Sequence, residues 1–232
     1  MRRVAIPLLL AGCGRLAFDP ASTDGPIGDG GAPLDAAQAP DAAPCIASAW
    51  STGFDTVPPW GALWLAPSTS LAQAAISGGE LRLTPVMAAG QYAGFAANTS
   101  VGFYDRRLSL DVRQGAGDAG VFLGLDATAT QDYLRVYLVD DVLSVVSSIG
   151  TDTIVLGSEV VDLVRERRWH LRERAGVVEV SVSADGAAAR QVWQGPTPSV
   201  LADVIVAIGV GLGTPATRPS VARIDDLVDC QE

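Results

Sequence analysis

The sequence predicts an all-β fold, an antiparallel sandwich of two sheets, on three observations. Short runs alternate apolar and polar residues with a period of two, which places one face of each run in a core. Gly, Asp and Pro separate these runs at the spacing of sandwich turns. No long segment repeats apolar residues with the 3.6 period of a helix. Of the 232 residues, 48% are hydrophobic, which is enough for a sizeable core.

Residues 1–12 have the layout of a secretory signal peptide. Met1-Arg2-Arg3 is positive, a short apolar run follows, and Leu10-Ala11-Gly12 precedes Cys13. This stretch resembles the lipobox of bacterial lipoproteins, in which the cysteine receives a diacylglyceryl group and the new amino terminus is acylated, often with palmitate. The resemblance implies a lipid anchor on Cys13 and a place in the cell envelope. The alternative is an ordinary signal peptide followed by a chance cysteine.

Residues 13–44 form the next segment, which consists mostly of Ala, Asp, Gly and Pro. Few large apolar groups means too little burial to offset the entropy of ordering, so we expect a disordered tether. It resembles the spacers that follow the lipid cysteine in surface lipoproteins. Gly14 stands where an Asp would favour the inner membrane in that family, which implies the outer membrane of a Gram-negative bacterium.

Cys45 and Cys230 enclose the part of the chain expected to fold, residues 45–232. A secreted protein occupies an oxidising compartment, so these two cysteines are predicted to form a disulfide once Cys13 is assigned to lipid. The alternative is a pair of free thiols. A bridge between them suits a sandwich whose first and last strands are neighbours.

About ten to twelve strands are expected along this region. The clearest alternate in and out around a shared set of apolar positions: Leu81/Leu83, Leu108/Leu110/Val112, Val121/Leu123/Leu125, Leu134/Val136/Leu138, Trp169/Leu171 and Val178/Val180/Val182. Turns are expected at Asp140-Asp141, Ala175-Gly176 and Asp185-Gly186. The runs 142–146, 204–210 and 221–228 complete the set.

Three of these segments resemble the concanavalin A-like lectin/glucanase (laminin-G-like) superfamily. Gly79-Glu80-Leu81-Arg82-Leu83 resembles its early strand, and Ile224-Asp225-Asp226-Leu227-Val228 its closing strand. Between them, Arg168-Trp169-His170-Leu171-Arg172 and the run from Val178 to Gly186 resemble its hairpin. The resemblance implies a two-sheet antiparallel jelly roll, a fold that hosts lectins, carbohydrate-binding modules and glucanases alike.

Several kinds of chemistry are disfavoured. A net charge of −10 repels nucleic acid, and no basic-aromatic pattern compensates. The Glu-x-Asp-x-x-Glu motif of the superfamily's glucanases is absent, which disfavours a glycosidase. His170 is the single histidine, and it is expected to be an ordinary strand residue rather than part of a triad or a zinc site.

Ligand-binding residues are sought on the outward faces of the strands. If Leu134, Val136 and Leu138 face the core, then Tyr133, Arg135 and Tyr137 face outward, as do Arg168, His170, Arg172 and Arg174 on another strand. Aromatic faces and planar hydrogen-bonding groups are typical of sugar sites. The ligand-binding candidates are therefore Tyr133, Arg135, Tyr137 and Arg172, together with Trp60 and Trp64 of an aromatic loop. The alternatives are a solvated face of Arg–carboxylate pairs and tryptophans that plug the core.

Some relatives in the superfamily hold a structural Ca²⁺ between early and late strands. The matching oxygen ligands here are Asp55 with Asp225 or Asp226, although Ca²⁺ needs six to eight oxygens. The alternative is a turn-capping or solvated pair of Asp residues.

The function expected from these features is a lipid-anchored envelope protein with a non-catalytic module that binds carbohydrate or another surface polymer. A divergent glycoside hydrolase or lyase is one alternative. A structural or adhesive envelope protein without a small ligand is another.

Overall fold

The computed structural model describes residues 46–47, 50–56, 63–66, 73–85, 92–185, 187–211 and 216–232. The predicted signal peptide and the whole predicted tether, Cys13 included, lie outside the described residues, and so do Cys45, Trp60 and Gly186. No helix in the described ranges is long and apolar enough to cross a membrane.

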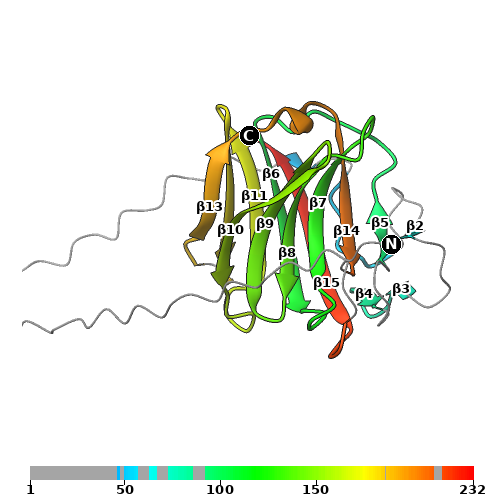
Figure 1. The fold of residues 1–232 in the computed structure, drawn as a ribbon. Helices are drawn as coiled ribbons and strands as arrows, with labels where there is room; N and C mark the ends of the chain where they lie inside the picture. Colours follow the sequence, from blue (N-terminus) through cyan, green and yellow to red (C-terminus); the bar gives the residue numbers. More distant parts are fainter. Residues whose placement is uncertain are drawn as a thin grey trace, which may run out of the picture. The chain divides into compact units, whose positions relative to one another are not determined.

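Two antiparallel sheets form the domain, as the sequence predicts (Figure 1). Sheet I has the spatial order β13 (Arg190–Pro196), β12 (Val177–Ser183), β11 (Arg168–Arg174), β6 (Arg106–Gln114), β15 (Ala222–Gln231), β4 (Leu81–Thr84), β3 (Gln73–Ile76), and β1 (Ile46–Ala47) also pairs with β15. Sheet II has the order β10 (Asp152–Val160), β9 (Val142–Ile149), β8 (Tyr133–Val139), β7 (Val121–Ala127), β14 (Val204–Val210), β5 (Tyr92–Ala96), β2 (Leu63–Ala66). A 3-10 turn, η1 (Ser199–Ala202), precedes β14.

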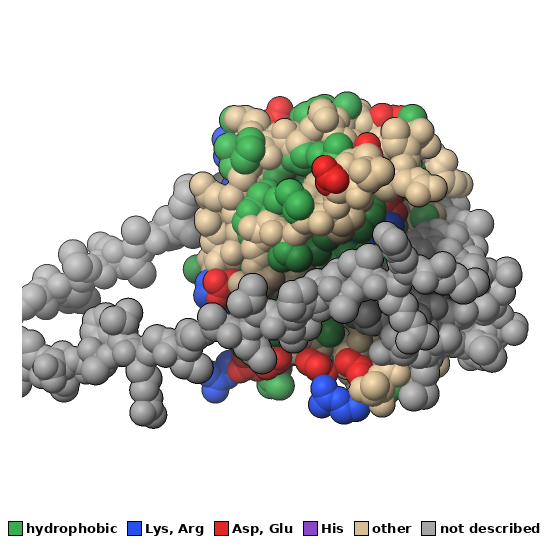
Figure 2. Space-filling model, viewed as in Figure 1, with side chains coloured by type: hydrophobic (Ala, Val, Ile, Leu, Met, Phe, Trp, Pro, Cys, Tyr) green, Lys and Arg blue, Asp and Glu red, His purple; other side chains and the backbone are tan. Residues whose placement is uncertain are grey.

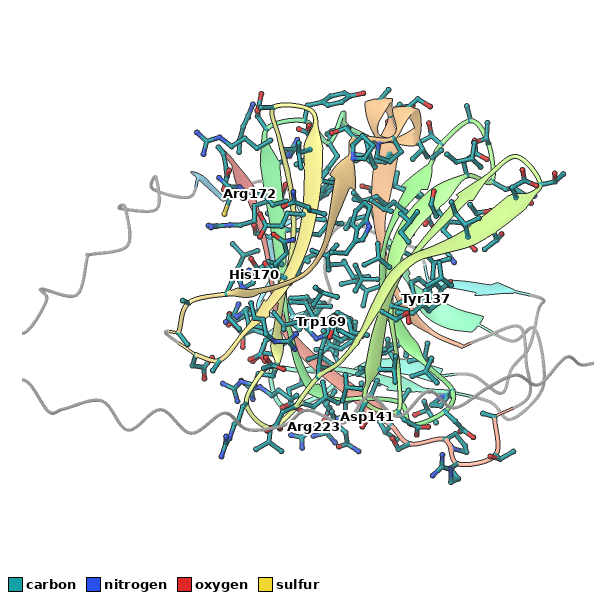
Figure 3. The ribbon with its side chains drawn as sticks, turned by 60° about the vertical axis from the view of Figure 1, so that its left-hand side comes forward. Tyr137, Asp141, Trp169, His170, Arg172 and Arg223 are labelled. Atoms are coloured by element: carbon teal, nitrogen blue, oxygen red, sulfur yellow. The ribbon has the colours of Figure 1, made fainter. Side chains whose placement is uncertain are left out.

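The period-two runs supply the core between the sheets. Leu108, Leu110 and Val112 of β6 are fully buried, and so are the predicted inward-facing apolar residues of β7, β8, β11 and β12. Trp169 of β11 lies between the two layers, while Tyr137 lies on one side of the sandwich and Arg172 on the other (Figure 3). Alternation therefore assigns each outward side chain to one of two opposite faces.

Turns join the strands at two of the three predicted places, and the third includes Gly186, which lies outside the described residues. Asp140 has a positive φ of 53° between β8 and β9, and Ala175 and Gly176 have φ of 51° and 81° between β11 and β12. Two consecutive residues with positive φ suit a two-residue hairpin, because their twist matches that of the flanking strands.

The first and last described strands are neighbours, as expected. Ile46 lies opposite Gln231, and Ala47 lies opposite Cys230, which is buried. Cys45 precedes this pair but lies outside the described residues, so its disulfide with Cys230 stays a prediction.

Candidate functional site

The predicted ligand-binding residues divide between the two outer faces. Tyr133, Arg135 and Tyr137 lie together on β8 of sheet II, whereas Arg172 lies on β11 of sheet I (Figure 3). Trp64 belongs to β2 and lies opposite Gly94 of β5. Arg172 therefore cannot belong to the same site as Tyr133, Arg135 and Tyr137. The two sheets present two separate candidate surfaces.

The first surface is a hollow of about 450 Å³ on sheet II, which we call the Tyr133 hollow. Its lining combines an aromatic ring, carboxylates, an amide and a hydroxyl with small apolar side chains: Ala96, Asp126, Ala127, Thr130, Gln131, Asp132, Tyr133, Arg135 and Ile205. Hydrophobic side chains gather over the strands of sheet II that face the viewer in Figure 2.

Arg135 organises this surface. Its guanidinium donates to both oxygens of Asp126, at 2.8 and 2.7 Å, and to the Tyr137 hydroxyl at 3.1 Å. Its carbon Cζ lies 4.2 Å from the centre of the Tyr133 ring and 4.7 Å from that of Phe122. Burial opposes the charge, but the hydrogen bonds and charge of Asp126 outweigh it and raise the pKa of Arg135 above its usual value. Arg135 thus holds Tyr133 in place as a rigid platform.

Gly124 permits this arrangement. A methyl group at Gly124 would lie 2.9 Å from Cγ of Arg135, so the arginine stem can lie flat across β7 only because no side chain stands there. Gly124 and Arg135 are direct cross-strand partners.

The second surface is a groove of about 510 Å³ on sheet I, which we call the His170 groove. Val228, Ser109, His170 and Ser181 form a row across β15, β6, β11 and β12. The walls carry guanidiniums, two carboxylates and the alanines of the β12–β13 connection: Arg107, Arg168, Arg172, Glu179, Ser183, Ala184, Asp185, Ala187 and Ala189.

His170 is held between two hydroxyls. Oγ of Ser109 lies 2.9 Å from Nδ1, and Oγ of Ser183 lies 2.9 Å from Nε2. Burial, followed by the charges of Arg107 and Arg168, lowers the pKa of His170 to about 4. The ring is therefore neutral near pH 7.

The contact between Ser183 and His170 does not suit nucleophilic catalysis. A triad needs a carboxylate to stabilise the imidazolium that forms, and here the third group is the hydroxyl of Ser109. The two arginines disfavour the same imidazolium. The groove is built for hydrogen bonding rather than for proton abstraction.

The three Asp residues predicted for calcium have different surroundings. A methyl group at Gly53 would lie 3.5 Å from Oδ1 of Asp226 and 3.5 Å from Oδ2 of Asp55, so these two carboxylates converge on Gly53. Asp225 instead accepts a hydrogen bond of 2.6 Å from Arg113. Within the described ranges, no group of three or more His, Cys, Asp or Glu side chains is arranged to hold a metal ion.

Sequence reasoning treated His170 as an ordinary strand residue and did not find its pair of hydroxyl partners. The register that brings Ser109 and Ser183 to the ring joins segments 61 and 13 residues away along the chain. The outward phase of Arg168, His170 and Arg172 was the available signal.

No protein-family model matches the sequence, and no curated protein does. Solved structures do. The Ca²⁺/Man3GlcNAc-bound exoplasmic/lumenal domain of VIP36 has a TM-score of 0.59 at 12% identity, over 79% of this chain and 89% of that one. LamAcat from Zobellia galactanivorans has 0.57 at 9% identity, over 78% and 96%. The CBM2 module of the evolved Dit of Lactobacillus casei BL23 phage J-1 has 0.53 at 11% identity, over 79% and 95%. These likenesses show the fold, which is the two-sheet antiparallel jelly-roll sandwich expected from the sequence.

Proposed function

We propose that this protein is a non-catalytic carbohydrate-binding module and that it binds sugar in the Tyr133 hollow. The observation that carries the proposal is the fixed Tyr133 ring beside Asp126, Gln131 and Asp132 in a hollow of about 450 Å³. Sugar sites combine an aromatic face with planar hydrogen-bonding groups in this way.

The solved structures of the same fold support a carbohydrate ligand. VIP36 is described in complexes with Man3GlcNAc and with Man2, and a LamA variant with laminaritriose and laminaritetraose. A further neighbour comes from work on endo-acting O-glycanases that initiate mucin breakdown. The last of these keeps a glycoside hydrolase as the alternative function.

The carboxylate geometry favours binding over hydrolysis. A glycosidase needs two carboxyl groups free to act on either side of the scissile bond. In the Tyr133 hollow, both oxygens of Asp126 accept hydrogen bonds from Arg135. Asp126 therefore positions Arg135 rather than acting as an acid, base or nucleophile.

The cellular location of the module is proposed from the sequence. Cys13 would carry the lipid, residues 13–44 would form the tether, and the domain would stand at the envelope, in the outer membrane of a Gram-negative bacterium. Radiolabelled palmitate should label the protein, and Cys13→Ala should release it from the membrane fraction. An unlabelled protein, or a Cys13→Ala protein that stays with the membrane, would contradict the anchor.

Calcium is proposed as a structural ion near Gly53. Asp55 and Asp226 would supply carboxylate oxygens, and backbone carbonyls would have to supply the rest. The VIP36 structures of this fold are described as Ca²⁺-bound.

A glycan array with the full chain tests the function. We expect neutral oligosaccharides to bind, and Tyr133→Ala to weaken that binding by about tenfold or more, because stacking on the ring is lost. Tyr104→Ala is the matched control, since Tyr104 is 45% exposed and lies outside the hollow. Equal binding by Tyr133→Ala and wild type would overturn the site. Turnover of a bound polysaccharide would favour the hydrolase, and no bound glycan would favour a structural envelope protein.

A further inference from the structure

The His170 groove collects positive charge on an otherwise acidic protein. Arg107, Arg168 and Arg172 line it, against the carboxylates of Glu179 and Asp185. Asp185 already forms an ion pair with Arg167. The chain as a whole has a net charge of −10, so this local excess of guanidinium is not a consequence of composition.

Arg107 and Arg168 lack the carboxylate within hydrogen-bond distance that other arginines of the domain have. Arg135 and Arg223 donate to carboxylates at 2.8 Å or less. The nearest carboxylate oxygen to Arg168 is that of Asp226 at 3.7 Å, and the nearest to Arg107 is that of Glu232 at 4.0 Å. Within the described part of the chain, neither guanidinium donates a hydrogen bond to an oxygen atom, and Nε of Arg107 is buried without a partner.

The strand register makes this arrangement costly. Arg107 of β6 and Arg172 of β11 are direct cross-strand partners, and like charges in such positions destabilise a sheet. Glu232 offsets the repulsion only in part, because it bonds Arg172 at 2.6 Å but stays 4.0 Å from Arg107. An anion that accepts hydrogen bonds from Arg107 and Arg168 would give both guanidiniums an oxygen partner, and its charge beside Arg107 would offset the repulsion from Arg172.

We propose that the His170 groove is a second ligand site, and that it binds the carboxylate or sulfate groups of an acidic polysaccharide between Arg107 and Arg168. Guanidinium N–H groups match the oxygens of such anions in geometry and charge. The hydroxyls of Ser109, Ser181 and Ser183 line the same groove, where they can exchange hydrogen bonds with the hydroxyls of a sugar.

The length of the groove favours a polymer over a single small ion. The row from Val228 to Ser181 crosses four neighbouring strands, which at the usual strand spacing of ~4.8 Å is roughly 14 Å. Among its described lining residues the groove has no Phe, Tyr or Trp, in contrast to the Tyr133 hollow. The two surfaces therefore suit ligands of different charge, and this inference does not depend on the proposed function of sheet II.

His170 provides a direct probe, because it is the single histidine of the chain and its ring signals need no assignment by elimination. The full chain is titrated at pH 7 with oligogalacturonate for the carboxylate arm, dextran sulfate fragments for the sulfate arm, and neutral dextran. We expect one or both anionic ligands to shift the His170 ring signals and neutral dextran to leave them unchanged. Whichever arm binds identifies the anionic group.

Variants separate a built site from general charge. Arg107→Gln and Arg168→Gln, made singly, should each weaken binding by about tenfold. Arg165→Gln removes the same charge from a side chain that is 83% exposed outside the groove, and should change affinity by less than about twofold. Tyr133→Ala should leave this binding intact even where it abolishes neutral-sugar binding. Melting temperatures confirm that each variant is folded.

Three outcomes would overturn the proposal. The His170 signals could stay unmoved by both anionic oligosaccharides. Arg165→Gln could weaken binding as much as Arg107→Gln and Arg168→Gln do. Neutral dextran could shift the His170 ring signals as much as the anionic ligands do.

Discussion

The buried carboxylate of Glu173 accepts a hydrogen bond of 2.7 Å from the backbone N–H of Asp105. Glu173 belongs to β11, and Asp105 has a φ of 48° just before β6. The other carboxylate oxygen accepts from the Gly176 N–H at 3.0 Å and from the Thr197 hydroxyl at 2.8 Å. One side chain thus fastens three loops at the same end of sheet I.

Replacing this carboxylate should be costly. Glu173→Ala leaves three donors without their acceptor, and we expect the free energy of unfolding to fall by about 2–4 kcal/mol in urea denaturation. Glu159→Ala is the control, since Glu159 is 53% exposed and its loss should cost less than about 0.5 kcal/mol. Equal costs for both variants would contradict the fastening role.

His170 should make stability depend on pH. Its pKa is about 4 in the fold against about 6.5 when unfolded, so the unfolded chain takes up the proton first as the pH falls. The stability that comes from a neutral His170 is fully present above about pH 6.5. The free energy of unfolding then falls by about 3 kcal/mol as the pH drops to about 4. Urea unfolding of wild type and His170→Gln at pH 7, 5.5 and 4.5 isolates this component, because the carboxylates titrate in both proteins. Parallel curves would refute the assignment.

Two glycines of sheet II should respond differently to alanine. A methyl group at Gly94 would lie 2.3 Å from the backbone oxygen of Ile208, whereas one at Gly124 meets the side chain of Arg135 at 2.9 Å. A backbone cannot move aside as a side chain can. We expect Gly94→Ala to cost about 3 kcal/mol and Gly124→Ala about 1 kcal/mol, the latter with weakened sugar binding because Arg135 is displaced. Thermal unfolding of both variants checks the order, which a larger loss for Gly124→Ala would reverse.

The predicted disulfide should contribute strongly. If Cys45 and Cys230 are joined, reduction should lower the free energy of unfolding by about 2–5 kcal/mol, because the bridge closes a long loop in the unfolded chain. Cys230→Ser should be equally destabilised and should no longer respond to reductant. Two reactive thiols in the denatured, unreduced protein would exclude the bridge.

The proposed calcium ion can be tested by removal. Saturating Ca²⁺ at about 100 times its dissociation constant should stabilise the fold by about 3 kcal/mol, so EDTA should lower the melting temperature. Asp55→Asn should melt at the same temperature with and without EDTA. A wild-type melting curve that EDTA leaves unchanged would rule the ion out.

The alternation of apolar residues was sufficient to predict the two-layer fold and the phase of its best strands. Leu134, Val136 and Leu138 are buried, and Tyr133, Arg135 and Tyr137 face outward together, as predicted. The signal failed for β3 and β5, whose Ala and Gly residues carry little contrast, and for β10, most of whose side chains are exposed.

Which residues share a site could not be predicted from the sequence of any one strand. Whether Arg172 joins Tyr137 or faces away from it is decided by which sheet each strand enters, and that choice rests on pairings between distant segments. The predicted alternative of Arg–carboxylate pairs also proved correct in places. Arg113, for example, donates to Glu80 and Asp225 on the outer face of sheet I.

The pairing of β1 with β15 determines how the domain would carry mechanical force. Ile46 and Ala47 attach to Gln231 and Cys230, and β15 lies between β6 and β4 rather than at an edge of its sheet. Tension along the chain that precedes β1 would therefore first load the two pairs Ile46–Gln231 and Ala47–Cys230, at the end of β15 that also pairs with β6. The two-residue pairing of β1 would give way first, and the longer ladder between β15 and β6 would stay paired behind it.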